Sequence, residues 1–135
     1  MTTPAQPPLK PIGHLRWVIP EGWIPDQSHG PAPELTSHEA ACILNVSDQP
    51  AHLQITIFFA DREPVGPYLI QVGPRRTKHI RYNDLTDPEP IPLATEYASL
   101  IESDVPIVVQ HTRLDSRQAA NALMTTIAFA DERSP

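Results

Sequence analysis

Residues Val105–Gln118 read Val-Pro-Ile-Val-Val-Gln-His-Thr-Arg-Leu-Asp-Ser-Arg-Gln, and this stretch decides the fold class. Four of its first five residues are β-branched, which is typical of a buried strand. From Gln110 onward nearly every side chain forms hydrogen bonds. Side chains alternate along a strand, so Val109, His111 and Arg113 share one face. The pattern predicts a buried strand whose polar end lines a pocket or braces a subunit contact.

Other short strands are indicated along the chain. The clearest is Ala51–Ala60, which alternates over its whole length and forms a predicted hairpin with Glu39–Val46. Glu96–Ser103 fits either one helical turn or a strand, and Ser116–Leu123 has helical propensity. The remaining predicted strands are His14–Ile19, Tyr68–Val72, Thr77–Tyr82, Val105–Leu114 and Ala122–Ala130.

Proline usage supports the same fold class. The 135 residues contain 17 prolines against five glycines, and proline belongs at strand starts, edges and loops. We therefore predict a single all-β domain, an antiparallel sandwich or barrel of about eight strands. We place it at residues 13–131, between a disordered proline-rich tail at 1–12 and a short C-terminal tail at 132–135.

Composition narrows the function classes. A net charge of −6 argues against general binding of polyanions. Cys42 is the one cysteine, so no intrachain disulfide can form and a reducing compartment is indicated. No apolar run has the length of a membrane span, and the N-terminus lacks the order of a signal peptide. We expect a cytoplasmic protein without metal or cofactor, since no ligand spacing or nucleotide motif is present.

Two groups of residues are candidates for a ligand pocket. Trp17 and Trp23 flank Glu21, an arrangement suited to sugars, because aromatic faces pack on apolar ligand surfaces while a carboxylate accepts hydroxyl bonds. The alternative is core or interface packing. His38 and Glu39 form a histidine–carboxylate pair that could act as a general base or metal ligand, although a hydrogen-bonded strand start is the favoured interpretation.

A basic cluster offers a second kind of site. Arg75, Arg76, Lys78 and Arg81 lie in or beside a predicted strand and could contact DNA or an acidic partner. The alternative is a solvated strand face paired with nearby aspartates.

Together these segments resemble the sensory rhodopsin transducer family from about Gly13 to Ala130. The resemblance is carried by Trp17, Glu21-Gly22, Ser37-His38-Glu39, Cys42–Asn45, Glu63–Tyr68, Arg75–His79, Asn83-Asp84-Leu85 and Val105–Gln118. It implies a non-catalytic β-sandwich protomer, commonly assembled as a homotetramer, with proposed roles in binding sugars, a sensory rhodopsin or DNA. Trp23 departs from the tyrosine usual in the family, which changes the size and polarity of any pocket there.

We therefore expect a non-catalytic transducer that recognises a small polar, sugar-like ligand or a receptor such as a sensory rhodopsin. The expected ligand-binding residues are Trp17, Glu21, Trp23, His38, Glu39, His111 and Arg113. A regulator that docks DNA weakly through the basic cluster is the alternative. A sugar-modifying enzyme using Glu21 or Glu39 is a further one.

Overall fold

The computed structural model describes residues 10–132 and is nearly all β. The strands are β1 (His14–Gly22), β2 (His38–Asn45), β3 (Ala51–Phe59), β4 (Val65–Val72), β5 (Arg76–Arg81), β6 (Tyr97–Asp115), β7 (Ala122–Ile127) and β8 (Phe129–Ala130). One 3-10 turn, η1 (Tyr82–Asp84), follows β5. All strand pairings within residues 10–132 are antiparallel. The prediction of an all-β antiparallel domain is confirmed, and the sheet does not close into a barrel. Most of the predicted 1–12 tail lies outside the described residues.

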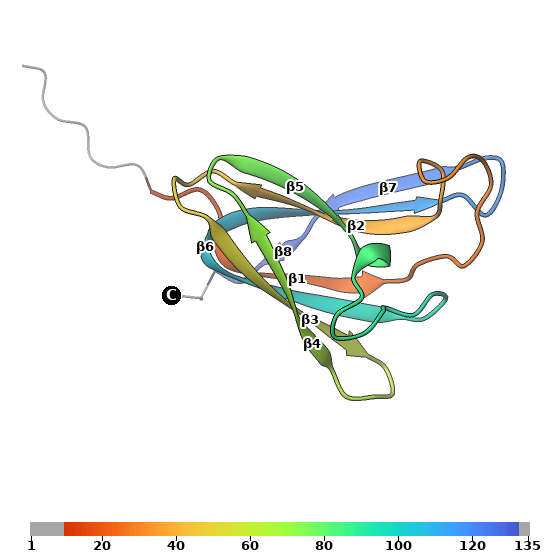
Figure 1. Ribbon diagram of the computed structural model, residues 1–135, viewed down its shortest axis with the longest axis horizontal. Helices are drawn as coiled ribbons and strands as arrows, with labels where there is room; N and C mark the ends of the chain where they lie inside the picture. Colours follow the sequence, from red (N-terminus) through yellow and green to blue (C-terminus); the bar gives the residue numbers. More distant parts are fainter. Residues whose placement is uncertain (1–9, 133–135) are drawn as a thin grey trace, which may run out of the picture.

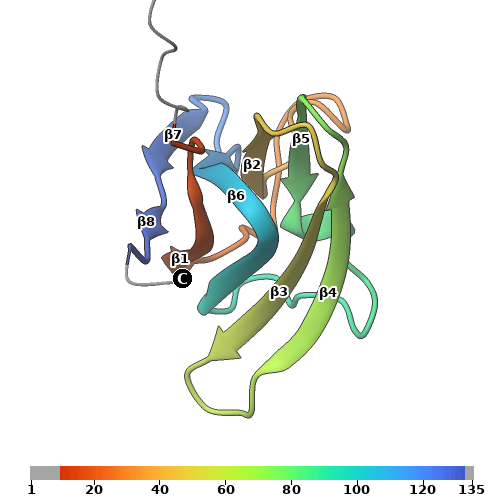
Figure 2. The same cartoon turned by 90° about the vertical axis from the view of Figure 1, so that its left-hand side faces the viewer.

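The strands form two layers that share β6 (Figure 1). One layer has the order β4-β3-β6-β1-β8, and the other joins β5, β2, the second half of β6 and β7. Figure 2 shows β6 curving through the centre of the molecule, with β3 and β4 to one side and β1, β7 and β8 to the other. Because β6 belongs to both layers, its two halves must present side chains to the same core.

The sequence predicts two elements where the structure has one. Glu96–Ser103 and Val105–Leu114 are both parts of β6, which is 19 residues long. The interruption is local: the Ser103 hydroxyl donates to the Val105 carbonyl at 2.7 Å, and Pro106 offers no N–H to a neighbouring strand. Pairing with β1 also shifts register here, since His14 pairs with Ile107 but Arg16 pairs with Glu102. This irregular segment is the point where β6 passes from one layer to the other.

The C-terminal prediction also needs correction. Ala122–Ala130 is two strands, because the chain bends at Ala128, whose N–H donates to the Val109 carbonyl at 3.1 Å. β7 pairs with β6, whereas β8 crosses to β1. The helical propensity of Ser116–Leu123 is not realised, since this segment is a loop leading into β7. Pairing with β6 outweighs a weak local preference.

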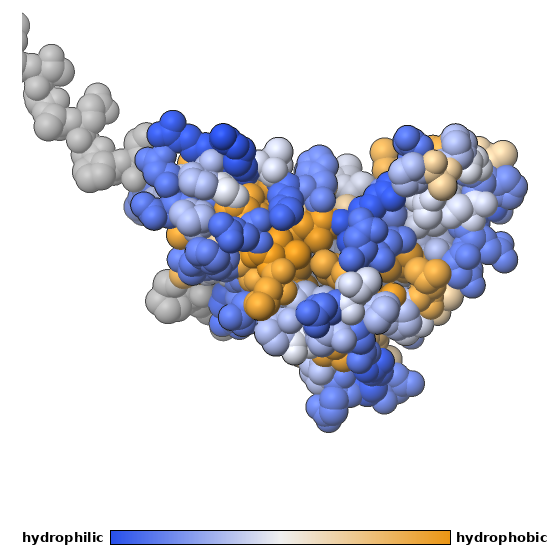
Figure 3. All heavy atoms as spheres, viewed as in Figure 1, coloured by the Kyte–Doolittle hydropathy of each residue, from blue (hydrophilic) through white to orange (hydrophobic). Residues whose placement is uncertain are grey.

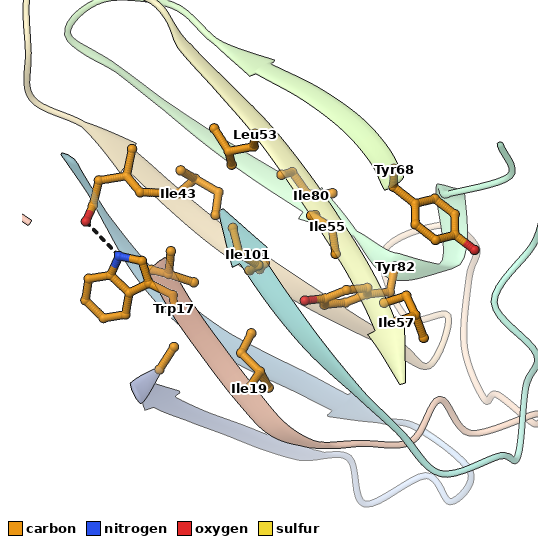
Figure 4. Packing of buried hydrophobic residues seen from close by; sticks show 14 of the residues in the cluster. Trp17, Ile19, Ile43, Leu53, Ile55, Ile57, Tyr68, Ile80, Tyr82 and Ile101 are labelled. Carbon is orange, nitrogen blue, oxygen red and sulfur yellow. Dashed lines mark hydrogen bonds between the residues drawn. The ribbon is translucent and has the colours of Figure 1, made fainter. Parts of the chain in front are cut away.

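Apolar side chains from both layers meet in one core (Figure 4). The alternating residues of β3 point inward as predicted, with Leu53, Ile55 and Ile57 almost fully buried. Ile43 and Ile101 meet them from β2 and β6. Burying each such side chain contributes about 1.5–3 kcal/mol relative to exposure, so this core is the main source of stability.

Trp17 is part of this core. Its exposed fraction is 4%, and its indole N–H donates to the carbonyls of Ile107 at 2.9 Å and His14 at 3.1 Å. Gly13 makes the close approach possible: its φ is 107°, and a Cβ there would lie 2.2 Å from the Ile107 carbonyl oxygen. Trp17 therefore fastens β1 to β6 beside the irregular segment.

We predict that Trp17→Phe lowers the free energy of unfolding by about 1–3 kcal/mol, because it keeps an aromatic ring but leaves the buried Ile107 carbonyl without its indole donor. Urea denaturation measures the loss. Trp23→Phe is the matched control and should change stability by less than about 1 kcal/mol, since the Trp23 ring is only partly buried. Equal losses in the two variants would contradict the assigned role of Trp17.

Candidate functional site

A buried carboxylate lies at the centre of the candidate site. Glu39 is the second residue of β2, and alternation points its side chain into the interior with Ala41 and Ile43. Its exposed fraction is 0%. A carboxylate at such a position requires compensation, because an unpaired buried charge costs several kcal/mol.

Four donors from three parts of the chain compensate Glu39. Oε1 accepts hydrogen bonds from the Trp23 backbone N–H at 2.8 Å and from the Tyr97 hydroxyl. Oε2 accepts from His111 Nε2 at 2.9 Å and from Arg113 Nε at 2.8 Å. We refer to these five residues, together with Glu21, as the Glu39 network.

Glu21 joins the network through Arg113. The Arg113 Nη2 donates to both Glu21 oxygens at 2.8 Å, while its Nε bonds Glu39. The Glu21 side chain is 65% exposed and the Arg113 side chain 18%. One guanidinium therefore connects a fully buried carboxylate to one that reaches solvent.

The surroundings keep Glu39 ionised. Burial alone would raise the pKa of Glu39, but the hydrogen bonds from His111 and Tyr97 and the charge of Arg113 outweigh it, so its pKa lies below the ordinary value of 4.5. Burial and the negative charge of Glu39 raise the pKa of the Tyr97 hydroxyl, which stays protonated as a donor. The network is thus a stable arrangement of fixed charges.

A groove borders the Glu39 network. It has a volume of about 460 Å³ and lies beside the bend at which β7 leaves β6 for β8 and β1. Its walls are mainly apolar, with Glu21, His111 and Thr126 as polar members; the lining residues are Ile19, Pro20, Glu21, His111, Met124, Thr126, Ile127, Ala128 and Phe129. The volume is within the range of small-molecule sites.

The structure brings four of the seven predicted pocket residues into direct side-chain contact: Glu21, Glu39, His111 and Arg113. Trp23 contributes its backbone N–H, while its ring lies against the Arg117 guanidinium, 4.9 Å away. The two remaining residues, Trp17 and His38, lie elsewhere.

Trp17 lies in the core, as described above. His38 points away from Glu39, since successive strand side chains face opposite sides, and its Nδ1 bonds the Thr36 carbonyl at 2.7 Å. Tyr97 belongs to the site but was not predicted, because Glu96–Ser103 was ambiguous. The signal available was a tyrosine at a strand start, which is too common to single out.

The basic cluster occupies or adjoins β5. Arg75 pairs with Asp48 at 2.6 Å, Lys78 donates to the Gln71 carbonyl, and Arg81 donates to the Pro33 carbonyl. Arg76 bonds only nearby carbonyls, those of Pro74 and Arg75. DNA binding through this cluster stays a prediction.

Two absences among the described residues bear on function. Across residues 10–132, histidine, cysteine and carboxylate side chains form no group of three or more placed to hold a metal ion. The same part of the chain contains no helix that is both long and apolar enough to cross a membrane.

Known proteins share this sequence pattern and this fold. A family model described as Anabaena sensory rhodopsin transducer matches residues 12–130. The chain belongs to this family. Among solved structures, it resembles the Anabaena sensory rhodopsin transducer with 60% identity and a TM-score of 0.71, over 82% of this chain and 96% of that chain. It also resembles Thermotoga maritima protein 1070 with 36% identity and a TM-score of 0.78, over 90% and 97%. No curated protein matches.

Family membership confirms the resemblance seen in the sequence and supports a transducer role. The matched range includes β1 to β8, so it covers both layers, every member of the Glu39 network and the whole lining of the groove.

We predict that Glu39→Gln lowers the free energy of unfolding by about 3–5 kcal/mol, because the amide removes the buried charge that Arg113 and His111 face and turns an N–H₂ toward donors. Urea denaturation at neutral pH measures the loss. Glu21→Gln, at an exposed carboxylate, is the matched control and should change stability by about 1 kcal/mol or less.

Glu39→Gln also tests whether the pKa of Glu39 is lowered in the folded chain. Since the pKa of Glu39 is lower in the folded chain than in the unfolded one, its carboxylate contributes stability above about pH 4.5, and this contribution disappears as the pH falls through the folded value. The unfolding free energy of Glu39→Gln should therefore fall less steeply with acid than that of the unsubstituted chain. Parallel acid profiles would contradict the assignment.

Proposed function

We propose that this protein is a non-catalytic cytoplasmic transducer that binds a small polar ligand or a receptor partner such as a sensory rhodopsin. The observation that carries the proposal is the Glu39 network, which connects the groove to the segment after β1 and to both ends of β6. Glu21 and His111 are the members of the network that line the groove.

The network supplies a physical path for a relay. A ligand or partner that moves Glu21 or His111 alters the donors available to Glu39. A buried acceptor that loses a donor costs about 1–3 kcal/mol, so the remaining members, including the Trp23 backbone, must readjust. Occupancy at the groove is thereby transmitted to the loop that follows β1.

The arrangement supports a binding role over a catalytic one. Glu21 and Glu39 share one guanidinium, and Glu39 has a donor on each oxygen besides Arg113. Catalytic carboxylates in glycoside hydrolysis need one protonated acid beside an ionised partner. The lowered pKa of Glu39 works against such a role, and the exposed Glu21 is held by Arg113.

A homotetramer forms part of the proposal. The outer face of the layer β5-β2-β6-β7 exposes Leu44, Leu123 and Ile127, with exposed fractions of 43%, 70% and 62%. These residues accompany the second half of β6, where the sequence places a subunit contact. Figure 3 shows a further apolar area in the middle of the molecule, in the region of β4 and β5 in Figure 1, between hydrophilic borders. Exposed apolar surface of this kind marks contact sites.

We predict that Glu21→Gln weakens binding of the ligand or receptor while the protein stays folded, because an amide replaces the charged group that lines the groove and pairs with Arg113. Titration with a sugar panel and with a sensory rhodopsin in detergent measures the affinity. Glu63→Gln, at an exposed carboxylate distant in sequence, is the control. Unchanged affinity in Glu21→Gln for a molecule that binds the unsubstituted chain would remove Glu21 from the site.

We predict a tetramer by light scattering at micromolar concentration. Leu123→Asp should shift the population toward smaller species, because it places a charge in the proposed contact. Leu69→Asp is the matched control, since Leu69 is 72% exposed but lies on β4 in the other layer. A monomer in the unsubstituted chain would refute the assembly.

A further inference from the structure

One ring nitrogen of the groove, Nδ1 of His111, has no hydrogen-bond partner among residues 10–132. The Nε2 of His111 bonds Glu39 Oε2 at 2.9 Å, and an ionised carboxylate only accepts, so Nε2 carries the proton. In the neutral imidazole, Nδ1 is then a bare acceptor. Residues 10–132 provide no hydrogen bond to it.

The position of Nδ1 follows from the hydrogen bonding of buried polar atoms in the described chain. His111 is only 3% exposed. In the described chain, no buried side-chain nitrogen or oxygen lacks a hydrogen-bond partner, so the unpartnered Nδ1 must lie at an accessible surface. The groove is the surface that His111 lines, and Nδ1 faces it.

The rest of the groove has a different character from a sugar site. Its other walls are mainly apolar and include Ile19, Met124 and Phe129. The two further polar members already have partners: Arg113 donates to both Glu21 oxygens, and the Thr126 hydroxyl donates to the Ile127 carbonyl at 3.3 Å. Neither tryptophan lines it, since Trp17 is buried in the core and Trp23 packs on Arg117. A sugar presents many hydroxyls, and most of them would be desolvated here without partners.

We propose that the groove binds a small molecule composed of an apolar ring and one N–H or O–H donor, which donates to Nδ1 of His111. This inference rests on the proposed ligand-binding role and names the chemical class for the same site. The volume of about 460 Å³ accommodates such a ring system, and the walls remove its apolar surface from water.

This ligand class explains how occupancy reaches Glu39. A donor at Nδ1 favours the tautomer with its proton on Nε2, which is the form that donates to Glu39 Oε2. Ligand binding therefore strengthens an existing bond of the network.

Two matched probes test the inference: indole, which has a ring N–H, and 1-methylindole, which lacks it. Calorimetric titration at neutral pH compares their affinities. We expect indole to bind about threefold to tenfold more tightly, the difference that one neutral hydrogen bond makes. Amide NMR shifts should appear at Met124 and Thr126.

A pair of variants locates the binding. Thr126→Phe adds a ring inside the groove and should weaken indole binding by about tenfold or more. Leu69→Phe adds the same ring on β4, in the other layer and outside the groove, and should leave the affinity within about twofold. Thermal unfolding of both variants confirms that they are folded.

Several outcomes overturn the inference: equal affinity for the two probes, shifts outside the groove, retained binding in Thr126→Phe, or no binding of either probe. Tighter binding of methyl glucoside at the same residues also overturns it, while leaving the proposed function intact. The proposed function fails separately, if no sugar and no rhodopsin binds, or if whatever binds is insensitive to Glu21→Gln.

Discussion

The buried carboxylate of Glu39 is the constraint around which the rest of the site is arranged. It has no access to water and accepts hydrogen bonds from Trp23, Tyr97, His111 and Arg113. Tyr97 begins β6, while His111 and Arg113 lie near its end. One carboxylate can meet both only because β6 curves from one layer into the other. The curvature and the buried charge therefore depend on each other.

The unclosed sheet has a direct consequence for function. β7 follows β6 in one layer, and after the bend at Ala128 the chain pairs with β1 in the other. Where these strands part, the groove opens and His111 and Glu21 become accessible from outside. A closed barrel would bury this region in a continuous ladder. The opening therefore places the groove next to the Glu39 network.

Family membership and the site geometry are two separate lines of support for a transducer role. The match over residues 12–130 assigns the chain to a transducer family. The geometry suggests how a signal could pass, since the exposed Glu21 and the buried Glu39 share the guanidinium of Arg113. Fixed hydrogen bonds between charged groups suit a relay, because one change of partner alters the energy of the whole group.

Several features were predictable because they depend on local pattern. Alternation in Ala51–Ala60 predicted the inward face of β3, and the polar end of Val105–Gln118 predicted that His111 and Arg113 share a face. These two inferences needed only the geometry of a single strand. Glu21 was expected in the pocket because Trp17 and Trp23 flank it, and the structure brings it to Arg113 although neither tryptophan lines the groove.

The contacts between residues far apart in the chain could not be predicted from the sequence. The sequence determined that the chain is all-β, where most strands lie and which side chains share a face, because a strand's two-residue period is a local property. Only the tertiary structure decided that β6 is one strand in two layers, that Tyr97 meets Glu39, that Trp17 belongs to the core and that His38 turns away. The physical reason is that these contacts join residues far apart in the chain, and their geometry depends on the curvature of β6 and the bend at Ala128.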